Sequence, residues 1–407
     1  MNIYQKIIIS IIIGSLWGFT MNIIFGIFLM LTAGILIKFT YFSFMIASSI
    51  SAIYFTIIKK KFYKKKNLIF FILIPIIIIT LTFGSPYGIS IRDKTIYQII
   101  FFFIQIFIIF ISIKLCLKGI GRMSFSRYFI EIIFVKVLKG IGFTFFLLII
   151  LFPFYLMMMA SMKTQALLLI NPLDLSIDFS RGFNVLNSYV ELFTVWKFGT
   201  FLINSFIVSI LSIFIALLFA IPGAYAVARF KFPGKYFLTN SILLIYLIPM
   251  ITLLIPLYSF FTQINLRDSL IGLIIVYPAV TIPVAIYMLQ GYFKTIPDEL
   301  EEAGLIDGLN RIGVIIKITL PLSLPAIASV SLFIFMVAWN EYLFAYMFLD
   351  TPELFTLPRG LNSLDGTEVP RQHLMAGSII STVPVIIIFL WAEKYLAGGL
   401  TAGGIKG

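Results

Sequence analysis

Cysteine and histidine are almost missing from this chain of 407 residues, which has one of each. The single cysteine, Cys116, excludes a framework of disulfide bonds within the chain. Together with the single histidine, His373, it also excludes a metal site built from several Cys and His ligands.

Charged residues are also scarce: they make up 12% of the chain, whereas 61% is hydrophobic. A soluble globular protein is closer to half apolar and a quarter charged. Because too few polar side chains remain to cover a water-facing surface, a soluble enzyme of this size is excluded. The net charge of +13 does not indicate a nucleic-acid partner, since Lys and Arg separate apolar runs and form no basic face.

What the chain does contain is long apolar runs. A helix needs about 20 apolar residues to cross a bilayer, and by that rule the sequence predicts roughly ten spans. The predicted spans are 7–37, 41–58, 68–83, 97–117, 142–162, 198–228, 236–261, 270–292, 324–348 and 375–396. Because the runs are apolar on every face and lack the alternation of barrel strands, we expect an all-α polytopic membrane protein.

The first run, 7–37, is long enough to be tilted, or broken near Gly14 and Gly18. It is too long for the apolar part of a cleavable signal peptide, and we expect it to remain as a membrane anchor. If it crosses twice, only the N-terminal end changes side.

Positive charges favour one orientation of these spans. With the N-terminus in the cytoplasm and the spans alternating, most of the 30 Lys and Arg residues fall on the cytoplasmic side. The positive-inside rule supports this arrangement. We therefore expect both termini in the cytoplasm and the polar segment 163–197 outside.

The character of the chain changes near residue 136. Before it, the spans are joined by short Lys-rich connections, and after it the loops are longer and more varied. We expect residues 1–135 to form an accessory N-terminal transmembrane region of about four helices, and residues 136–407 to form the functional core.

The most informative loop runs from Thr295 to Pro321, on the predicted cytoplasmic side. Thr295 and Asp298 resemble a capping box, and Pro297 suits a first helical turn. Gly308 can end this helix, and a second short amphipathic run follows at 311–319. By residues alone, an ordinary solvated loop with a charged face fits as well as a docking element.

This loop resembles the "EAA" signature of ABC-importer permeases: Glu-Ala-Ala, three residues, Gly, nine residues, then Ile-x-Leu-Pro. The matching residues, at the family spacing, are Glu302, Ala303, Gly304, Gly308, Ile318, Leu320 and Pro321. One position departs, because Gly304 stands where the second alanine is usual. Glycine is still small, so close packing is expected to survive at about 1 kcal/mol of local helix propensity.

The similarity extends in order from Phe152 to Gly407 and narrows the family to carbohydrate permeases. The matching stretches include 222–234, Ile255-Pro-Leu-Tyr258, Trp339-Asn-Glu341, Phe355-Thr-Leu-Pro358 and the tail 394–407. The tail is similar to that of the G-type permease of maltose transporters. Residues 1–135 lie outside the resemblance.

The resemblance implies a six-helix type I importer permease core within 136–407, preceded by the additional N-terminal helices. It implies a subunit that forms half of the path for a carbohydrate (maltose, maltodextrin or a related sugar) across a bacterial cytoplasmic membrane. The implied partners are a second permease in a heterodimer, two ATPase subunits and an extracytoplasmic solute-binding protein. This chain would have no catalytic residue and no cofactor, with ATP and Mg held by the ATPase.

In such assemblies a cytoplasmic coupling loop, here 293–323, docks on the ATPase. The resemblance assigns this contact to Glu301, Glu302, Ala303, Gly304, Asp307, Gly308, Ile318, Leu320 and Pro321. It assigns a second contact to the tail 397–407, through Thr401, Ala402, Gly403 and Gly404. A frayed terminus is the alternative for the tail.

Two other motifs give weaker evidence about function. The run from Gly399 to Lys406 is not a phosphate loop, because Ile405 interrupts the required Gly-Lys-Ser/Thr ending. Glu341 is the acidic residue within the spans, and with Trp339 and Asn340 it either lines the translocation path or fixes helix packing.

Two other classes of protein remain. An ion-coupled secondary transporter would need buried charged sites at the midplane and an internal repeat, and Glu341 alone supports it. A membrane-embedded transferase would need clustered acids or histidines, which the sequence does not offer. The solute itself is not identified by the sequence.

Overall fold

The computed structural model describes residues 3–33, 40–57, 74–82, 96–117, 127–172, 174–175, 177, 179–366 and 369–399. These residues form helices and connecting loops, and no strand occurs among them. Helices are what a lipid environment demands, because they satisfy every backbone N–H and C=O within the segment. The all-α polytopic architecture expected from the composition is therefore confirmed.

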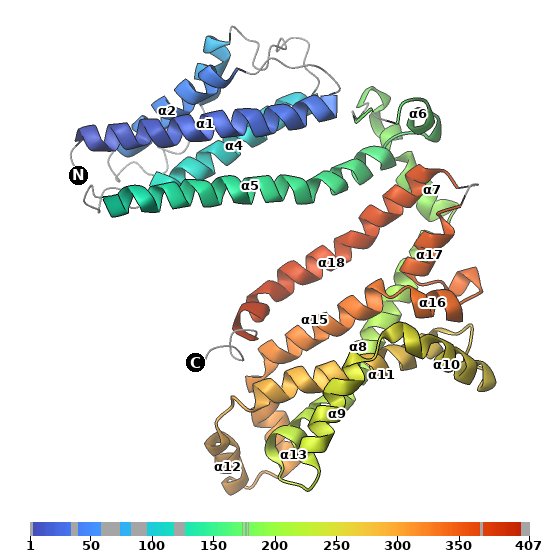
Figure 1. Cartoon of the computed structure of the whole chain (residues 1–407). Coiled ribbons are helices and arrows are strands. Elements are labelled where there is room, and N and C mark those ends of the chain that lie inside the picture. The colour runs from blue at the N-terminus through green and yellow to red at the C-terminus, as the bar shows by residue number, and fades with distance from the viewer. Residues whose placement is uncertain are drawn as a thin grey trace. The chain divides into compact units, whose positions relative to one another are not determined.

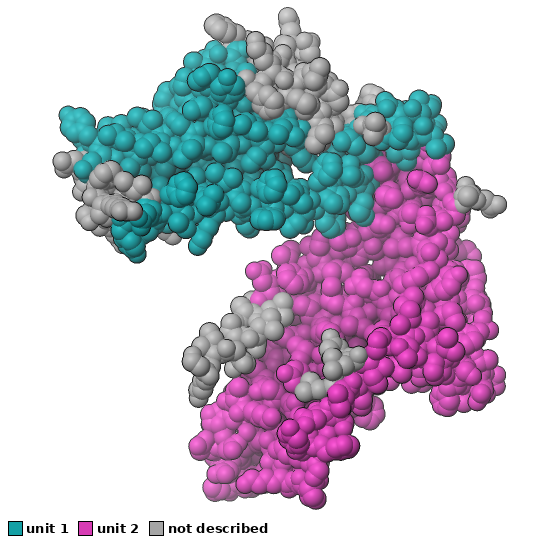
Figure 2. Space-filling model, in the orientation of Figure 1, with its two compact units in different colours: residues 1–159, 166–178 teal, residues 160–165, 179–407 magenta. Residues whose placement is uncertain are grey.

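The chain divides into two compact units, residues 1–159 with 166–178 and residues 160–165 with 179–407 (Figure 2). The helices of the first unit include α1 (Ile3–Ala33), α2 (Tyr41–Ile57), α4 (Ile96–Leu117) and α5 (Arg127–Ser161). The short α6 (Gln165–Ile170) follows at the junction of the units. Residues 74–81 are also helical, while the rest of the expected span 68–83 lies outside the described residues, apart from the turn at residue 82.

The first helix, α1, is continuous through Gly14 and Gly18, so of the two alternatives, a tilted or a broken span, the break is not found. A Cβ on Gly14 would lie 2.5 Å from the Cα of Ser49, and one on Gly18 would lie 2.4 Å from the carbonyl oxygen of Phe44. The two glycines, four residues apart, therefore let α2 approach the α1 backbone, as small residues do between membrane helices. The hydroxyls of Ser15 and Ser49 lie 2.9 Å apart across the same contact.

The second unit begins with η5 (Phe179–Leu186) and α7 (Asn187–Thr194). Its long helices are α8 (Phe198–Arg229), α11 (Leu270–Phe293), α15 (Leu324–Asn340) and α18 (Arg371–Gly399), as Figure 1 shows. Between them lie α9 (Lys235–Leu247), α10 (Met250–Gln263), α12 (Asp298–Ile306), α13 (Arg311–Val314), η6 (Ile315–Thr319), α14 (Leu320–Leu322), α16 (Leu343–Phe348), η7 (Pro352–Leu354) and α17 (Leu357–Ser363).

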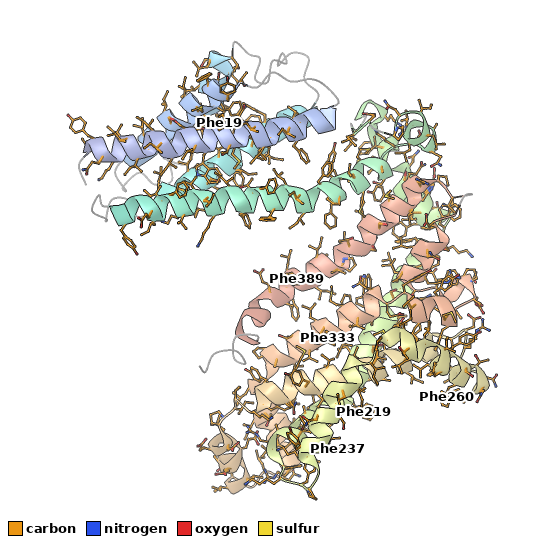
Figure 3. The ribbon with its side chains drawn as sticks, viewed as in Figure 1. Phe19, Phe219, Phe237, Phe260, Phe333 and Phe389 are labelled. Carbon is orange, nitrogen blue, oxygen red and sulfur yellow. The ribbon has the colours of Figure 1, made fainter. Side chains whose placement is uncertain are left out.

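Two apolar clusters hold this unit together. One, around Phe198, Tyr277 and Phe348, joins α8, α11 and α15 to the short helices α16 and α17. The other, around Tyr225, Phe293 and Ile334, joins the opposite ends of the same three helices. Many large apolar side chains face outward instead, including the labelled Phe219, Phe237 and Phe389 in Figure 3. Such exposure suits a surface covered by lipid rather than water.

Five described helices are long and apolar enough to cross a membrane: Ile3–Leu29, Glu131–Ser161, Phe198–Arg229, Leu270–Phe293 and Arg371–Glu393. A sixth span arises if Arg311–Leu322 and Leu324–Asn340, bent by 81°, are counted together. The expected spans 236–261 and 324–348 are each two helices, broken at Ile248–Pro249 and at Glu341. Shorter apolar helices are Tyr41–Tyr54, Phe102–Leu117 and Met250–Gln263.

Candidate functional site

The loop between α11 and α15 begins with a short helix, α12, whose N-terminus is set by proline. Pro297 is the N-cap, and Asp298, Glu299 and Glu301 occupy the first turn, where carboxylates interact favourably with the helix dipole. The predicted capping box is wrong, because the Thr295 hydroxyl donates instead to the carbonyl of Tyr292 at 2.7 Å. The helix therefore begins two residues later than the capping box implies, at Asp298.

The end of α12 follows the prediction for Gly308, which has a φ of +87°. The N–H of Leu309 donates to the carbonyl of Gly304 at 3.0 Å, and the N–H of Gly308 donates to that of Leu305 at 3.1 Å. This pair of bonds is the Schellman arrangement, which places a left-handed residue just after the helix. Gly308 ends the helix because it adopts that conformation without a steric penalty.

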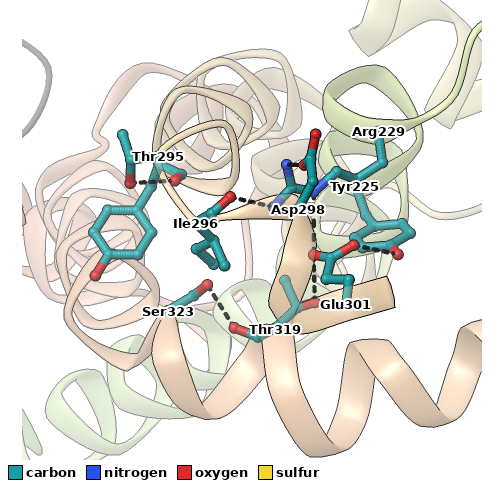
Figure 4. A network of polar contacts seen from close by, with 9 residues as sticks. Tyr225, Arg229, Thr295, Ile296, Asp298, Glu301, Thr319 and Ser323 are labelled. Carbon is teal, nitrogen blue, oxygen red and sulfur yellow. Dashed lines mark hydrogen bonds and ion pairs between the residues drawn. The ribbon is translucent and has the colours of Figure 1, made fainter. Parts of the chain in front are cut away.

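A polar network built on Glu301 fastens α12 to the end of α8 (Figure 4). The Glu301 side chain is buried, and its carboxylate accepts from the Tyr225 hydroxyl at 2.9 Å and from Arg229 Nε at 3.1 Å. The Thr319 hydroxyl donates to the same carboxylate at 3.0 Å. Both oxygens of this buried carboxylate are thus bonded, as a buried charge requires.

Arg229 completes the network from the other side. Its guanidinium also pairs with Asp298 and donates to the carbonyl of Ile296 at 2.8 Å. One arginine at the end of a membrane helix therefore holds the chain before α12, the first turn of α12 and its buried carboxylate. Its planar, fixed set of donors suits such multiple contacts.

Gly304, the position that departs from the family pattern, is buried in the contact between α12 and the second arm of the loop. A Cβ there would lie 2.4 Å from Ile318 Cδ1, 3.5 Å from Leu309 Cδ1 and 3.6 Å from Val314 Cγ2. Glycine therefore lets the end of Ile318 fill the space that an alanine methyl group would occupy. These two signature positions are therefore in direct contact.

The second arm of the loop is a short helical run that re-enters the membrane. Asn310 caps α13, since its side chain accepts from the N–H of Gly313 at 2.7 Å. The run continues through the π-helical turn η6 and α14, where Ile318 and Leu320 are half-buried and Pro321 is exposed. The predicted second amphipathic helix is therefore present, with one π turn inside it.

The remaining predicted coupling residues lie on the surface. Glu302, Ala303, Asp307 and Gly308 are all exposed. Next to them, Ile306 has 86% of its surface exposed, a large value for an apolar side chain in a charged loop. The predicted contact set thus includes two buried residues, Glu301 and Gly304, two half-buried ones, Ile318 and Leu320, and an exposed remainder.

Of the three candidate path residues, Trp339, Asn340 and Glu341, two are buried and hydrogen-bonded within the protein. Glu341 is buried, and its carboxylate accepts from the Tyr277 hydroxyl at 2.9 Å and from the N–H of Phe344 at 2.9 Å. Trp339 is also buried, and its Nε1 donates to the carbonyl of Ser381 at 3.2 Å. Asn340 alone of the three is exposed. For Glu341 and Trp339 these contacts favour the packing alternative.

At the other end of α11, Asp268 joins the loop 264–269 to residues 350–351. Its carboxylate accepts from the N–H of Asp350 at 2.9 Å and from both the N–H and the hydroxyl of Thr351, at 3.0 and 2.5 Å. Burial by itself raises the pKa of Asp268, but these hydrogen bonds and the neighbouring Arg267 hold that pKa below its usual 3.8.

Asn204 and Ser205, at the same end of the unit as Asp268, bind the segment 353–357. The Asn204 side chain donates to the carbonyl of Glu353 at 2.8 Å, and the Ser205 hydroxyl accepts from the N–H of Leu357 at 2.6 Å. The two ends of the helix bundle are therefore closed by separate polar networks.

The predicted tail residues Thr401, Ala402, Gly403 and Gly404 lie outside the described residues. Within the described part of the chain, no group of three or more His, Cys, Asp or Glu side chains comes together as metal ligands. His373 instead lies 2.7 Å, Nε2 to Oε2, from Glu191.

Sequence reasoning missed Tyr225, Arg229 and Thr319 as partners of the loop. The available signal was Arg229 itself, the first charge after a long uncharged span. An arginine at this position is equally well explained by the positive-inside rule. The sequence therefore did not indicate that Arg229 pairs with a residue more than sixty positions away.

Comparisons with known proteins identify the family of the chain. Residues 212–401 match the family model described as "Binding-protein-dependent transport system inner membrane component". The inner membrane ABC transporter permease protein YcjP of Escherichia coli is 40% identical over 270 residues, 65% of this chain and 95% of that protein. The trehalose/maltose transport system permease protein MalG of Thermococcus litoralis is 33% identical over 281 residues, 68% of this chain and 99% of that protein.

A solved bacterial ABC transporter involved in alginate import shares the fold, with a TM-score of 0.56 and 23% identity. The match covers 67% of this chain and 99% of the other. The helical architecture, the family model and the relatives lead to one conclusion: the chain belongs to the binding-protein-dependent transport system inner membrane components, within the permeases of sugar ABC importers.

Proposed function

We propose that this chain is one of two permease subunits of a sugar importer, and that its loop 293–323 is the contact through which an ATPase drives it. The family to which the chain belongs consists of permeases of binding-protein-dependent ABC importers. Membership therefore implies an ATPase and a solute-binding protein as partners. ATP and Mg would then be held by the ATPase rather than by this chain.

The exposed side of α12 is the observation that carries the proposal. It presents Ala303 beside Glu302 and the almost fully exposed Ile306, and the exposed Gly308 follows just after the helix. Small residues allow a partner to approach closely, and the exposed Ile306 adds apolar area that such a contact could bury. A partner with an apolar pocket rimmed by basic groups would fit this surface.

The network on Glu301 supports transmission of force. A docking helix attached loosely would move without moving the spans behind it. Here α12 is joined to α8 through Arg229 and Tyr225, and to η6 through Thr319. A rotation imposed on α12 would therefore be passed to the membrane helix α8 and to the loop segment η6 that leads toward α15, as rigid-body alternation of access requires.

The solute is proposed to be a maltose- or maltodextrin-like sugar. Support comes from the names of the relatives, which include a trehalose/maltose permease and an arabinooligosaccharide permease. Asn340 is the exposed candidate for the path, and the tail from Thr401 to Gly404 is a second candidate contact with the ATPase. Stimulation of ATP hydrolysis by maltodextrins, trehalose, arabino-oligosaccharides or glycerol phosphate would rank these solutes.

The proposal is tested by purifying the tagged full chain from native membranes and identifying the subunits that remain bound. Ala303→Trp should abolish retention of the ATPase and sugar uptake while leaving membrane insertion intact, because a bulky side chain blocks close docking. Asn362→Trp, an equally exposed position on α17 at the other end of the bundle, should retain the ATPase. Retention of the ATPase by Ala303→Trp, or uptake driven by an ion gradient without any ATPase, would overturn the proposal.

A further inference from the structure

The N-terminal unit contains a cavity of about 570 Å³ between three of its helices. Trp17 of α1 forms its floor, Ile111 and Leu115 of α4 form one wall, and Phe143 and Leu147 of α5 form the other. The proposed transport function uses none of these residues. The cavity therefore requires its own explanation.

The floor of the cavity is held in place. The Trp17 indole donates from Nε1 to Cys116 Sγ at 3.4 Å. On the α5 side, a Cβ on Gly140 would lie 2.6 Å from the Trp17 ring, so glycine is what allows the ring to lie against the α5 backbone. Both contacts fix the indole in one orientation and leave the space above it open.

The cavity is elongated along α5. Its lining residues on this helix run from Lys136 to Leu147 at spacings of three and four, which is one face of a helix. At a rise of 1.5 Å per residue this face is roughly 16 Å long. An apolar groove of that length fits an extended hydrocarbon chain.

One end of the groove is positively charged. Lys136 and Lys139 both line it, and both are exposed. Lys139 is the last charged residue before an uncharged stretch that runs through residue 162, so it marks where the apolar part of α5 begins. None of the described lining residues is acidic, and neither lysine has an ion-pair partner in the described part of the chain.

We propose that this cavity binds one anionic glycerophospholipid, with an acyl chain in the apolar groove and the phosphate beside Lys136 and Lys139. The membrane in which the chain is embedded supplies such lipids, and basic pockets between membrane helices are suited to their headgroups. The two lysines argue against a zwitterionic lipid, whose own cation would lie near them. The apolar walls argue against a soluble phosphate, which would leave them unused.

The test uses the full-length chain in mild detergent and counts bound lipids by native mass spectrometry during titration. Wild type should bind phosphatidylglycerol at one site more tightly than phosphatidylcholine, by about fivefold per lysine. Lys136→Gln with Lys139→Gln should bring the two lipids to similar affinity. Lys6→Gln with Lys231→Gln removes the same charge elsewhere and should keep the preference.

A second variant acts on the groove instead of the charge. Leu147→Trp should fill the apolar end and weaken both lipids, while the protein still inserts and elutes as wild type. Equal binding of the two lipids by wild type, or a preference that survives the double lysine change, would overturn the proposal. Inorganic phosphate that displaces the lipid at the same concentration would also overturn the proposal. So would a double lysine variant that loses a bound protein subunit while its bound lipid is unchanged.

Discussion

Glu301 shows how one buried side chain can hold the loop 293–323 in place from within. It is buried at the centre of the network with Tyr225, Arg229 and Thr319, and its neighbour Glu302 is the exposed one. Removing one member of a buried ion pair is costly, because the other charge is left without compensation. An exposed pair contributes little, since water screens it.

We therefore expect Glu301→Gln to destabilise the loop by about 1–3 kcal/mol, the cost of weakening buried, charge-assisted hydrogen bonds. Asp298→Asn is the matched control: Asp298 pairs with the same arginine, but its side chain is 74% exposed, so the cost should stay below about 1 kcal/mol. Thermal unfolding in detergent should show a clear drop for the first variant and little change for the second. Equal drops would show that burial does not decide the strength of this network.

Among the elements, α12 is bounded by backbone geometry at both ends. Pro297 sets where it starts, and the positive φ of Gly308 sets where it stops. Its orientation depends on that stop, because the Schellman bonds direct the chain back toward α13. Because α12 is short, the residues at its two ends largely determine its length and position.

Gly308→Ala should cost about 1–2 kcal/mol, because an L-residue is strained in the left-handed region. No atom lies within 4 Å of the added Cβ, so the cost is conformational and not a clash. Gly291→Ala in α11 has equally open surroundings without a positive φ, and it should be neutral or stabilising. Gly308→Asn should fall between them in thermal unfolding, since asparagine tolerates this conformation. If Gly308→Ala melts no lower than Gly291→Ala, the end of α12 does not depend on this residue.

For the whole molecule, the second unit closes its two ends with different loops. The loop 293–323 meets the C-terminal end of α8 through Arg229, while residues 353–357 meet the N-terminal end through Asn204 and Ser205. At a rise of 1.5 Å per residue, Asn204 and Arg229 are about 38 Å apart along α8, more than the thickness of the hydrocarbon core. The two sets of loops therefore lie on opposite sides of the membrane.

The distribution of Lys and Arg predicts which set of loops faces the cytoplasm, and cysteine labelling can test this orientation. Asn362→Cys should react with a membrane-impermeant maleimide in intact spheroplasts, because its loop is predicted to lie outside. Lys231→Cys should react only after permeabilisation. The background is low because the native Cys116 is buried. Reaction of Lys231→Cys in intact cells, with Asn362→Cys protected, would reverse the predicted orientation.

Much of this arrangement follows from local sequence. Apolar length predicted the class of protein and most helices, and Gly308 predicted the end of α12, because these features depend on residues within a few positions. The capping box at Thr295 failed for a local reason: the hydroxyl bonded to the carbonyl three residues before it. The boundary predicted at residue 136 stays a functional proposal, and by contacts α5 groups with the N-terminal helices.

The sequence by itself determined that the chain spans a membrane with helices, and it located the loop with the family signature. Only the tertiary structure decided which carboxylate of that loop is buried, that Gly304 packs against Ile318, and that Gly14 and Gly18 join two helices rather than break one. The physical reason is distance along the chain. Helix formation and capping are short-range, whereas burial and polar pairing depend on partners such as Arg229 that only folding brings close.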